Sequence, residues 1–360
     1  FSIGEPDFDT PENIKEAGIR GIKENHTHYG PSAGLPEARE AIARYISKTR
    51  GISSSAEQVV VTPGAKPIIF FSILALVDEG DEVLYPNPGF PIYESMINFI
   101  GAKAVPIPLL EEEEFSFDPK ALEKLITPKT KLVILNSPQN PTGGVIPKDS
   151  LKLVAELAQK YDFWVLSDEI YSRLVYDGEF QSISQFDPAL ERTIILDGHS
   201  KTYAMTGWRL GYGVMRPELA EHIARLMTNS NSCTCTFTQL AGIEALEGPQ
   251  DGAEAMKKEF HKRRDVIVEG LNQIPGIRCL KPKGAFYVFP NVTEVCKRKN
   301  FNDSKELQNY LLYEAGVALL GRTCFGRKNV DEKEEYVRLS YATSLADIEK
   351  GLDKMKKALS

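Results

Sequence analysis

Two basic side chains follow a strand-like run, and their types suit covalent and anion-binding chemistry. Lys201 comes after the run Thr-Ile-Ile-Leu-Asp at 193–197, and Arg209 lies further on in Gly-Trp-Arg-Leu-Gly. A lysine that is buried or lies near other cations has a lowered pKa and can attack a carbonyl as a free amine. An arginine beside it can hold a phosphate through paired hydrogen bonds. The pair indicates a site that holds an aldehyde as a Schiff base and binds its phosphate.

Two further strand-like runs lead into segments that suit the same kind of ligand. The run 59–62 is followed by Pro-Gly-Ala-Lys at 63–66 and then by a helical pattern. Such a junction offers free backbone N–H groups to a phosphate, and Gly64 allows a close approach. Asn140 lies in the rigid loop Asn-Ser-Pro-Gln-Asn-Pro-Thr-Gly-Gly at 136–144, where its amide can donate to a ligand oxygen. Turns of both kinds are common, so either feature alone also fits plain structure.

A carboxylate and a phenol follow the apolar run 163–166. Asp168 and Tyr171 lie in Ser-Asp-Glu-Ile-Tyr. A buried acid is costly unless it is paired, and such a pair could keep a pyridine nitrogen protonated while the tyrosine donates to a phenolate oxygen. Taken alone, the aspartate would more often be a helix cap. Because ligands of open α/β sheets bind at the carboxyl ends of strands, the four features together predict one site.

The segments that carry these residues alternate between strand and helix patterns. Strands are predicted at 59–62, 81–85, 131–135, 163–166 and 193–196, and helices from Thr10 as cap, at 35–49, 67–77 and 151–161. The middle strands are apolar almost throughout, which is typical of strands covered by helices on both faces. We therefore predict an α/β domain with a mainly parallel sheet.

The pattern changes beyond about Pro249. A long charged helix at 251–273 is followed by predicted strands at 284–289, 316–320 and 336–340, and by a final helix capped by Ser344. This predicts a smaller α+β domain, and a length of 360 residues suits two domains. The acidic run 111–114 is predicted to be a solvated loop.

Composition narrows the class of protein. The net charge of −7 argues against nucleic acid or an anionic membrane as the main partner. No apolar run approaches the roughly 20 residues that span a bilayer. The five cysteines are scattered, and the closest pair, Cys233 and Cys235, lacks metal-ligand spacing, so we predict reduced thiols, no metal site and a cytoplasmic protein. The chain opens on Phe1 without an initiator Met, and we expect a preceding segment to be missing.

Four segments in chain order carry a resemblance to a known family. They are the loop at 136–144, Ser-Asp-Glu-Ile-Tyr at 167–171, Ser-Lys-Thr-Tyr-Ala-Met-Thr-Gly-Trp-Arg at 200–209 and Val-Arg-Leu-Ser-Tyr-Ala-Thr at 337–343. Together they resemble the fold-type I pyridoxal-phosphate aminotransferases of class I, particularly the prokaryotic and archaeal aspartate, alanine, aromatic and kynurenine enzymes. The resemblance covers essentially the whole chain. It implies a mixed, mainly parallel sheet in a large cofactor-binding domain of residues 31–272, and a small domain of residues 1–30 and 273–360.

The same resemblance implies a role for each candidate residue around pyridoxal 5′-phosphate. Lys201 is the catalytic lysine that holds the aldehyde and later moves the Cα proton, and Asp168 pairs with the ring nitrogen. The other cofactor contacts are the ring-stacking Phe90, the phenolic-oxygen donors Asn140 and Tyr171, and the phosphate contacts Arg209, the backbone of Ala65 and Lys66, and Tyr29 from the second subunit of a homodimer. Arg338 binds the substrate α-carboxylate, and Gly4, Phe90 and Asn140 also line the substrate side of the site.

One position departs from the family pattern. Many relatives have a serine three residues before the lysine, where its hydroxyl donates to the phosphate. This chain has Gly198 there. Ser200 is the candidate substitute.

The implied reaction is a ping-pong transfer of an amino group from an L-amino acid to a 2-oxo acid. Aspartate with 2-oxoglutarate is the first choice, although no basic residue in 90–99 obviously awaits a second carboxylate. Aromatic, alanine or kynurenine transamination therefore stays open, as do a carbon–sulfur β-lyase and a non-catalytic regulator on the same fold. A Rossmann dehydrogenase is disfavoured because no Gly-x-Gly-x-x-Gly follows the first strand.

Overall fold

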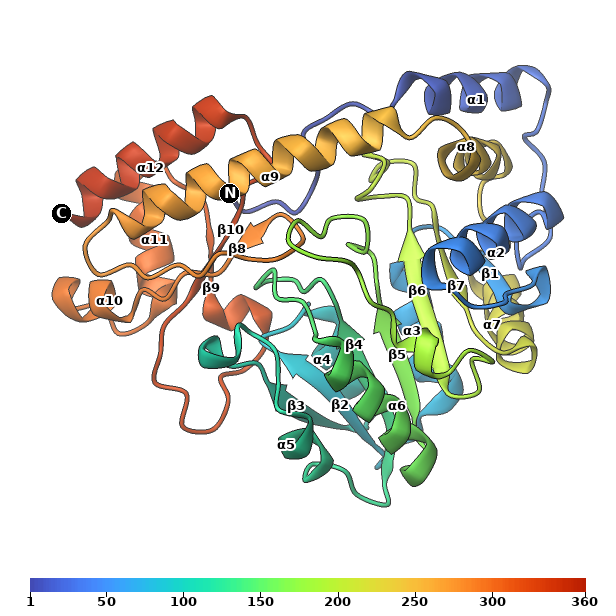
Figure 1. The fold of residues 1–360 in the computed structure, drawn as a ribbon, viewed down its shortest axis with the longest axis horizontal. Helices are drawn as coiled ribbons and strands as arrows, with labels where there is room; N and C mark the ends of the chain where they lie inside the picture. The colour runs from blue at the N-terminus through green and yellow to red at the C-terminus, as the bar shows by residue number, and fades with distance from the viewer.

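The computed structural model describes residues 1–360 and is built around a seven-stranded sheet (Figure 1). Its strands are β1 (Val59–Thr62), β2 (Glu82–Asn87), β3 (Lys103–Pro108), β4 (Thr130–Asn136), β5 (Trp164–Asp168), β6 (Thr193–Gly198) and β7 (Gly211–Val214). Their spatial order is β1-β7-β6-β5-β4-β2-β3. β7 runs antiparallel to both of its neighbours, and β2 to β6 are parallel. The predicted mixed, mainly parallel sheet is confirmed.

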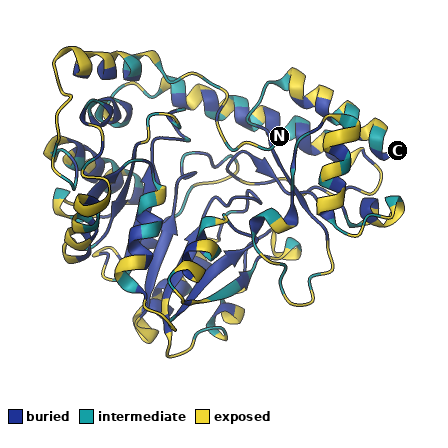
Figure 2. Ribbon diagram, turned by 180° about the vertical axis from the view of Figure 1, so that it is seen from behind, coloured by how far each residue is buried: buried dark blue, intermediate teal, exposed yellow.

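Helices cover both faces of this sheet. On one face, α3 (Lys66–Leu76), α4 (Ile92–Phe99) and α7 (Pro217–Ser230) pack on strand residues such as Leu132 and Leu166. On the other face, α6 (Lys148–Tyr161), α2 (Pro36–Arg50) and α8 (Thr236–Glu247) pack on the alternate residues, such as Val133 and Ile195. Successive side chains of a strand point to opposite faces, so a strand covered twice is apolar throughout. Figure 2 shows the strands buried and the outer faces of the helices exposed.

A second, three-stranded antiparallel sheet forms the smaller part of the molecule. Its order is β8-β10-β9, with β8 (Tyr287–Val288), β9 (Leu320–Gly321) and β10 (Val337–Ser340). The helices α10 (Thr293–Lys299), α11 (Ser304–Ala315) and α12 (Leu345–Leu359) accompany it. The long helix α9 (Asp251–Asn272) extends across both parts and packs on α12 (Figure 1).

The start of the chain contacts both parts. The backbone of Phe1 accepts a hydrogen bond from Ser340 of β10 at 2.8 Å, while α1 (Glu12–Lys23) packs on α8. The division into residues 31–272 and residues 1–30 with 273–360 stays a prediction. No helix has both the length and the apolar sequence needed to cross a bilayer.

Several predicted elements differ from the observed ones. The strands expected at 284–289 and 316–320 shrink to the two-residue β8 and β9, because Ala285 has a φ of 57° and Gly316 forms the left-handed end of α11 with a φ of 63°. β3, which contains two prolines and lies at the sheet edge, and the glycine-containing β7 lacked a clear strand pattern. A short helix, α5 (Pro119–Glu123), precedes β4.

Two polar predictions also need correction, and one cap is confirmed. Thr10 does not cap α1, because its hydroxyl donates to the carbonyl of Ala204 at 2.7 Å. Glu111 is not solvated: it accepts hydrogen bonds from Arg278 at 2.8 and 2.7 Å, and its side chain is 10% exposed. Ser344 caps α12 as expected, since its Oγ accepts from the Asp347 N–H at 3.1 Å.

Candidate active site

A cavity of about 450 Å³ lies at the carboxyl ends of β4, β5 and β6. Eighteen residues line it, and every predicted site residue except Tyr29 is among them. The predicted members are Gly4, Ala65, Lys66, Phe90, Asn140, Asp168, Tyr171, Ser200, Lys201, Arg209 and Arg338. The fold therefore brings together residues that lie far apart in the sequence.

Lys201 lines the cavity, and its side chain has a lowered pKa. Its Nζ donates to the carbonyl of Gly4 at 2.6 Å. Burial is the main cause that lowers the pKa of Lys201 to about 8, with Arg209 and Arg338 adding to the effect and Glu5 opposing it. Loss of solvation disfavours the ammonium form, so a free amine is available near neutral pH. This is what a nucleophile and proton carrier requires.

Asp168 is buried beside Tyr93, a residue that sequence reasoning missed. The hydroxyl of Tyr93 donates to Asp168 Oδ2 at 2.7 Å, and the Ile170 N–H reaches Oδ1 at 3.3 Å. Burial raises the pKa of Asp168 to about 6, although both hydrogen bonds act in the opposite direction. A carboxylate in such surroundings is stabilised by a cationic partner, which a protonated ring nitrogen would be.

Asn136 fixes the loop between β4 and Asn140. Its Oδ1 accepts from the Asn140 N–H at 2.9 Å, and its Nδ2 donates to the carbonyl of Asp168 at 3.1 Å. The carbonyl of Pro138 accepts from the same Nδ2 at 3.3 Å. Asn136 thus ties the Asn140 loop to the end of β5. Its position as the last residue of an apolar strand was the available signal.

The first turn of α3 and Arg209 together form a cradle for an anion. Helix N-termini leave their first N–H groups unpaired, and here these belong to Ala65 and Lys66. Arg209 has a φ of 55° and donates from Nη1 to the carbonyl of Thr206 at 2.7 Å. A Cβ at Gly64 would lie 2.2 Å from Arg209 Nη2, so only glycine allows this approach. The cradle suits a phosphate.

The departure at Gly198 has a structural reason. A Cβ at Gly198 would lie 3.0 Å from the Gly211 Cα and 3.1 Å from the carbonyl of Leu210, so this position faces β7. Gly198 does not line the cavity, whereas Ser200 does. Of residues 198–200, Ser200 is therefore the one that can offer a hydroxyl to an anion in the cavity.

Arg338 lines the cavity and has one donor without a partner. Its Nη1 donates to Asn140 Oδ1 at 3.1 Å and its Nη2 to the carbonyl of Ser2 at 2.5 Å, while its buried Nε has no partner. Its guanidinium lies 4.6 Å from the ring centre of Tyr287. Buried polar groups without partners are uncommon, and a ligand carboxylate would satisfy this one.

Tyr287 is a second residue that sequence reasoning missed. Its hydroxyl lies 2.8 Å from the hydroxyl of Tyr171, and a Cβ at Gly4 would lie 2.1 Å from it. Gly4 is therefore required for the start of the chain to pass this ring. Tyr287 was visible only as one aromatic residue in a predicted strand.

The remaining predicted residues differ in their surroundings. The ring of Phe90 borders the cavity, with the ammonium of Lys66 5.1 Å from its centre. Tyr29 lies outside the cavity and is 89% exposed. Within its own subunit, Tyr29 therefore does not contribute to the lining of the cavity.

The site as a whole fits pyridoxal 5′-phosphate. It offers a low-pKa lysine, a buried carboxylate, an aromatic ring, an anion cradle and an arginine with an orphaned donor. These correspond to the aldehyde, ring nitrogen, ring face and phosphate of the cofactor and to a substrate carboxylate.

Sequence and structure comparisons agree on the family. Residues 1–355 match the family model for aminotransferase class I and II. The aspartate aminotransferase of Pyrococcus horikoshii is 41% identical over 362 residues, which cover 100% of this chain and 90% of that protein. Aromatic-amino-acid aminotransferase 2 of Thermococcus litoralis is 39% identical, covering 100% of this chain and 91% of that protein. The structure of the aspartate aminotransferase from Thermus thermophilus with maleate matches with a TM-score of 0.92 at 38% identity, covering 99% of this chain and 90% of that one.

The chain belongs to the class I and II aminotransferase family and has the fold-type I architecture of its relatives. It is a pyridoxal 5′-phosphate-dependent aminotransferase, and its substrates are amino acids and 2-oxo acids.

Proposed function

We propose that this enzyme transfers the amino group of L-aspartate to 2-oxoglutarate. The observation that carries the proposal is the charge of the cavity lining, which holds Lys66, Lys201, Arg209 and Arg338 against the single carboxylate of Asp168. Of these cations, Lys201 would bind the cofactor aldehyde, Arg209 the phosphate and Arg338 the substrate α-carboxylate. The ammonium of Lys66 lies 5.1 Å from the ring centre of Phe90 at the cavity wall and remains for a further anionic group. A dicarboxylic amino acid supplies that group.

The names of the relatives support the same choice. The Pyrococcus horikoshii relative is named an aspartate aminotransferase, and the Thermus thermophilus structure contains maleate, a dicarboxylate. The Thermococcus litoralis relative is named for aromatic amino acids, so aromatic donors are the main competitors. Alanine and kynurenine are the other donors to compare.

In the proposed mechanism the side chains have separate tasks. Bound pyridoxal phosphate supplies an electron sink that stabilises negative charge at the substrate Cα. Asp168 keeps a positive charge at the ring nitrogen, and Asn140 and Tyr171 donate to the phenolic oxygen. Arg338 orients the substrate through its α-carboxylate, with Gly4 lining that pocket. Lys201, with a pKa of about 8, would accept the substrate Cα proton as a free amine and deliver it to the C4′ carbon of the cofactor.

We also propose a homodimer in the cytoplasm that serves amino-acid biosynthesis. The exposed Tyr29 supports the dimer, because its hydroxyl has no route to the cavity of its own subunit. The five cysteines are all free, which supports a reducing compartment. Tyr29 would then contact the phosphate bound by the partner subunit.

A substrate panel tests the proposal. The purified enzyme with cofactor is assayed with aspartate, phenylalanine, alanine and kynurenine as donors and 2-oxoglutarate as acceptor. We expect the highest kcat/KM with aspartate and a loss of that preference in Lys66→Gln, with little change for phenylalanine. Highest kcat/KM with phenylalanine or alanine would overturn the aspartate assignment. Release of pyruvate without an acceptor would point to β-elimination instead.

A further inference from the structure

The backbone pairing between β5 and β6 ends where the catalytic groups begin. Asp168 is in register with Leu196, and the last backbone hydrogen bond runs from the Glu169 N–H to the Leu196 carbonyl at 2.8 Å. Asp168 is the last residue of β5, and the turn that leads to Lys201 follows the end of β6. Beyond Glu169, side chains rather than the sheet connect the two strands.

Arg50, at the C-terminus of α2, makes that connection. Its Nε donates to Glu169 Oε2 at 2.8 Å and its Nη2 donates to Asp197 Oδ2 at 2.6 Å. All three side chains are at most 3% exposed. Glu169 directly follows Asp168, and Asp197 Oδ1 accepts the Gly198 N–H at 2.7 Å at the start of the Lys201 turn. One guanidinium therefore joins the two segments that carry the catalytic groups.

The surroundings of Arg50 hold this bridge in one geometry. Ser167 and Ser182 donate to Glu169 Oε1 at 2.9 and 2.6 Å. Ser172 donates to Asp197 Oδ2 at 3.2 Å, and the ring of Phe180 lies 4.9 Å from the Arg50 guanidinium. The other titratable groups that face the bridge are Tyr45 from α2, Tyr212 from β7 and Arg173. The oxygens and donors of the bridge are satisfied, so the side chains have little freedom to rearrange.

Stability alone is a poor reason for such a bridge. Removing two carboxylates and a guanidinium from water costs free energy that their attraction only partly repays, and buried ion pairs often add little stability. Their better-attested effect is to specify geometry. None of Arg50, Glu169 and Asp197 lines the cavity, so none of them touches cofactor or substrate.

We propose that Arg50 is a positioning residue for transamination. By joining Glu169 to Asp197 it fixes the separation between Asp168 and Lys201, the groups at opposite ends of the cofactor ring. The proposal rests on the roles given above to those two residues. A displacement of about 1 Å between reacting groups can lower a rate by about 100-fold, so a support that is not in contact with the substrate can still govern kcat.

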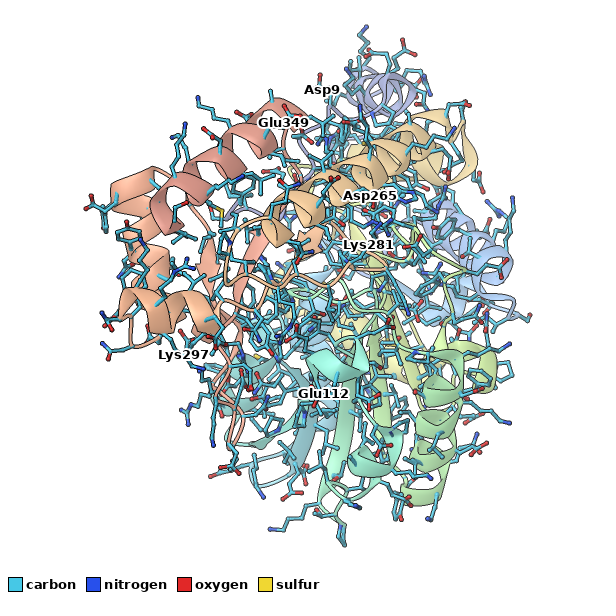
Figure 3. All side chains as sticks on the ribbon, turned by 60° about the vertical axis from the view of Figure 1, so that its left-hand side comes forward. Asp9, Glu112, Asp265, Lys281, Lys297 and Glu349 are labelled. Atoms are coloured by element: carbon cyan, nitrogen blue, oxygen red, sulfur yellow. The ribbon has the colours of Figure 1, made fainter.

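The test compares variants of Arg50 with variants of another buried arginine. Arg50→Lys keeps the positive charge but removes the guanidinium fork that reaches Glu169 and Asp197. Arg50→Met removes the charge as well as the fork. The control is Arg264 on α9, which is 2% exposed, does not line the cavity and also pairs with two carboxylates. Its partners, Asp177 and Asp265, are 49% and 47% exposed, and Figure 3 places Asp265 near Lys281. For each holoenzyme we measure kcat, the KM of the amino donor and the pH midpoint of the visible absorption of the bound cofactor. Thermal unfolding of the apoenzyme reports stability separately.

We expect Arg50→Lys to lower kcat about tenfold or more and to leave KM within about twofold, because Arg338 is not disturbed. The absorption midpoint should shift by about half a pH unit or more, since Asp168 and Lys201 change their relative positions. Arg264→Lys and Arg264→Met should lower thermal stability without a change in kcat or in the absorption midpoint. If Arg50→Met fails to fold, Arg50→Lys decides the question.

Two results would overturn the proposal. One is an Arg50→Lys enzyme with wild-type kcat and absorption midpoint. The other is an equal shift in the Arg264 variants at matched stability, which would make the effect general destabilisation. Failure of the aspartate assignment is distinguishable, because the same comparison is then made with whichever donor the wild-type enzyme uses.

Discussion

The hydroxyl of Tyr93 lies 2.7 Å from Asp168 Oδ2, in a pocket where both side chains are buried. Tyr93 stands in the first turn of α4, three residues after the predicted ring-stacking Phe90. One short segment thus supplies both Phe90, which borders the cavity, and a hydrogen-bond donor to Asp168, the carboxylate proposed to pair with the ring nitrogen. Burial keeps the pKa of Tyr93 well above its usual value, so the phenol stays a donor.

Tyr93→Phe should raise the pKa of Asp168 further, because a hydrogen bond that stabilises the carboxylate is lost. A hydrogen bond to a charged group contributes about 1.5–3 kcal/mol, so we expect kcat to fall by roughly 10- to 100-fold. The acid limb of the pH–kcat profile should move to higher pH. Tyr85→Phe, on the neighbouring β2, is the control, and an acid limb that stays in place in Tyr93→Phe would contradict the prediction.

The stability of the apoenzyme should depend on Lys201 in a pH-dependent manner. Burial lowers the pKa of this lysine from 10.5 to about 8 in the folded protein, so between these values the unfolded chain holds a proton that the folded chain has released. Stability therefore rises with pH across this window, and the full penalty, about 3 kcal/mol, is present below pH 8. Lys201→Met should be more stable than wild type at pH 7 in urea unfolding, and the difference should shrink towards pH 10. Lys350→Met, at an exposed position, is the control. The prediction is contradicted if the stability difference between Lys201→Met and wild type is the same at pH 7 and pH 10, or if Lys350→Met shows an equal difference.

Arg338→Lys tests the carboxylate contact. Lysine keeps the charge but cannot form two parallel hydrogen bonds, so the KM of the amino donor should rise by about 10- to 100-fold. The cofactor absorption of the resting enzyme should be unchanged, because the proposed phosphate contacts, Arg209 and the first turn of α3, are left intact. Arg327→Lys, at an exposed position outside the cavity, provides the comparison. An unchanged KM for Arg338→Lys would remove Arg338 from the substrate site.

Mixed dimers test the contribution of Tyr29. Lys201→Ala has no catalytic lysine, and Tyr29→Ala should bind the cofactor less tightly. If Tyr29 acts across the interface, a hybrid of these two chains contains one site with both wild-type residues. Refolding the two inactive variants together should then restore about a quarter of the wild-type activity at limiting cofactor, as statistical mixing of a two-fold dimer predicts. No recovery in verified hybrid dimers would place Tyr29 outside the partner's site.

The sequence predicted those parts of the structure that depend on local pattern and on fixed motifs. β5 and β6 were recognised because strands buried on both faces are apolar throughout, and Lys201, Asp168 and Asn140 were found because they follow such strands. β7 escaped because two of its four residues are glycines: Gly211 admits the backbone of Ala65 at the cradle, and Gly213 leaves space for Ile68 and Met215.

The missed site residues have a common physical reason. Tyr93, Tyr287 and, through its bond to the Asp168 carbonyl, Asn136 contact residues distant in the chain; Tyr287, for example, shares a hydrogen bond with Tyr171. No periodicity or spacing within one segment records such a contact. The same holds for Arg50, whose helix pattern predicts burial of its face but not the two carboxylates that await its guanidinium.

Two carbonyls at the start of the chain accept hydrogen bonds from basic residues of the cavity. The carbonyl of Ser2 accepts from Arg338 and that of Gly4 accepts from Lys201. By the role proposed for Arg338, the α-carboxylate of an incoming amino acid shares this guanidinium with the Ser2 carbonyl. The affinity for the amino acid then reports the difference between two sets of hydrogen bonds, and it depends on the first residues of the chain as well as on Arg338.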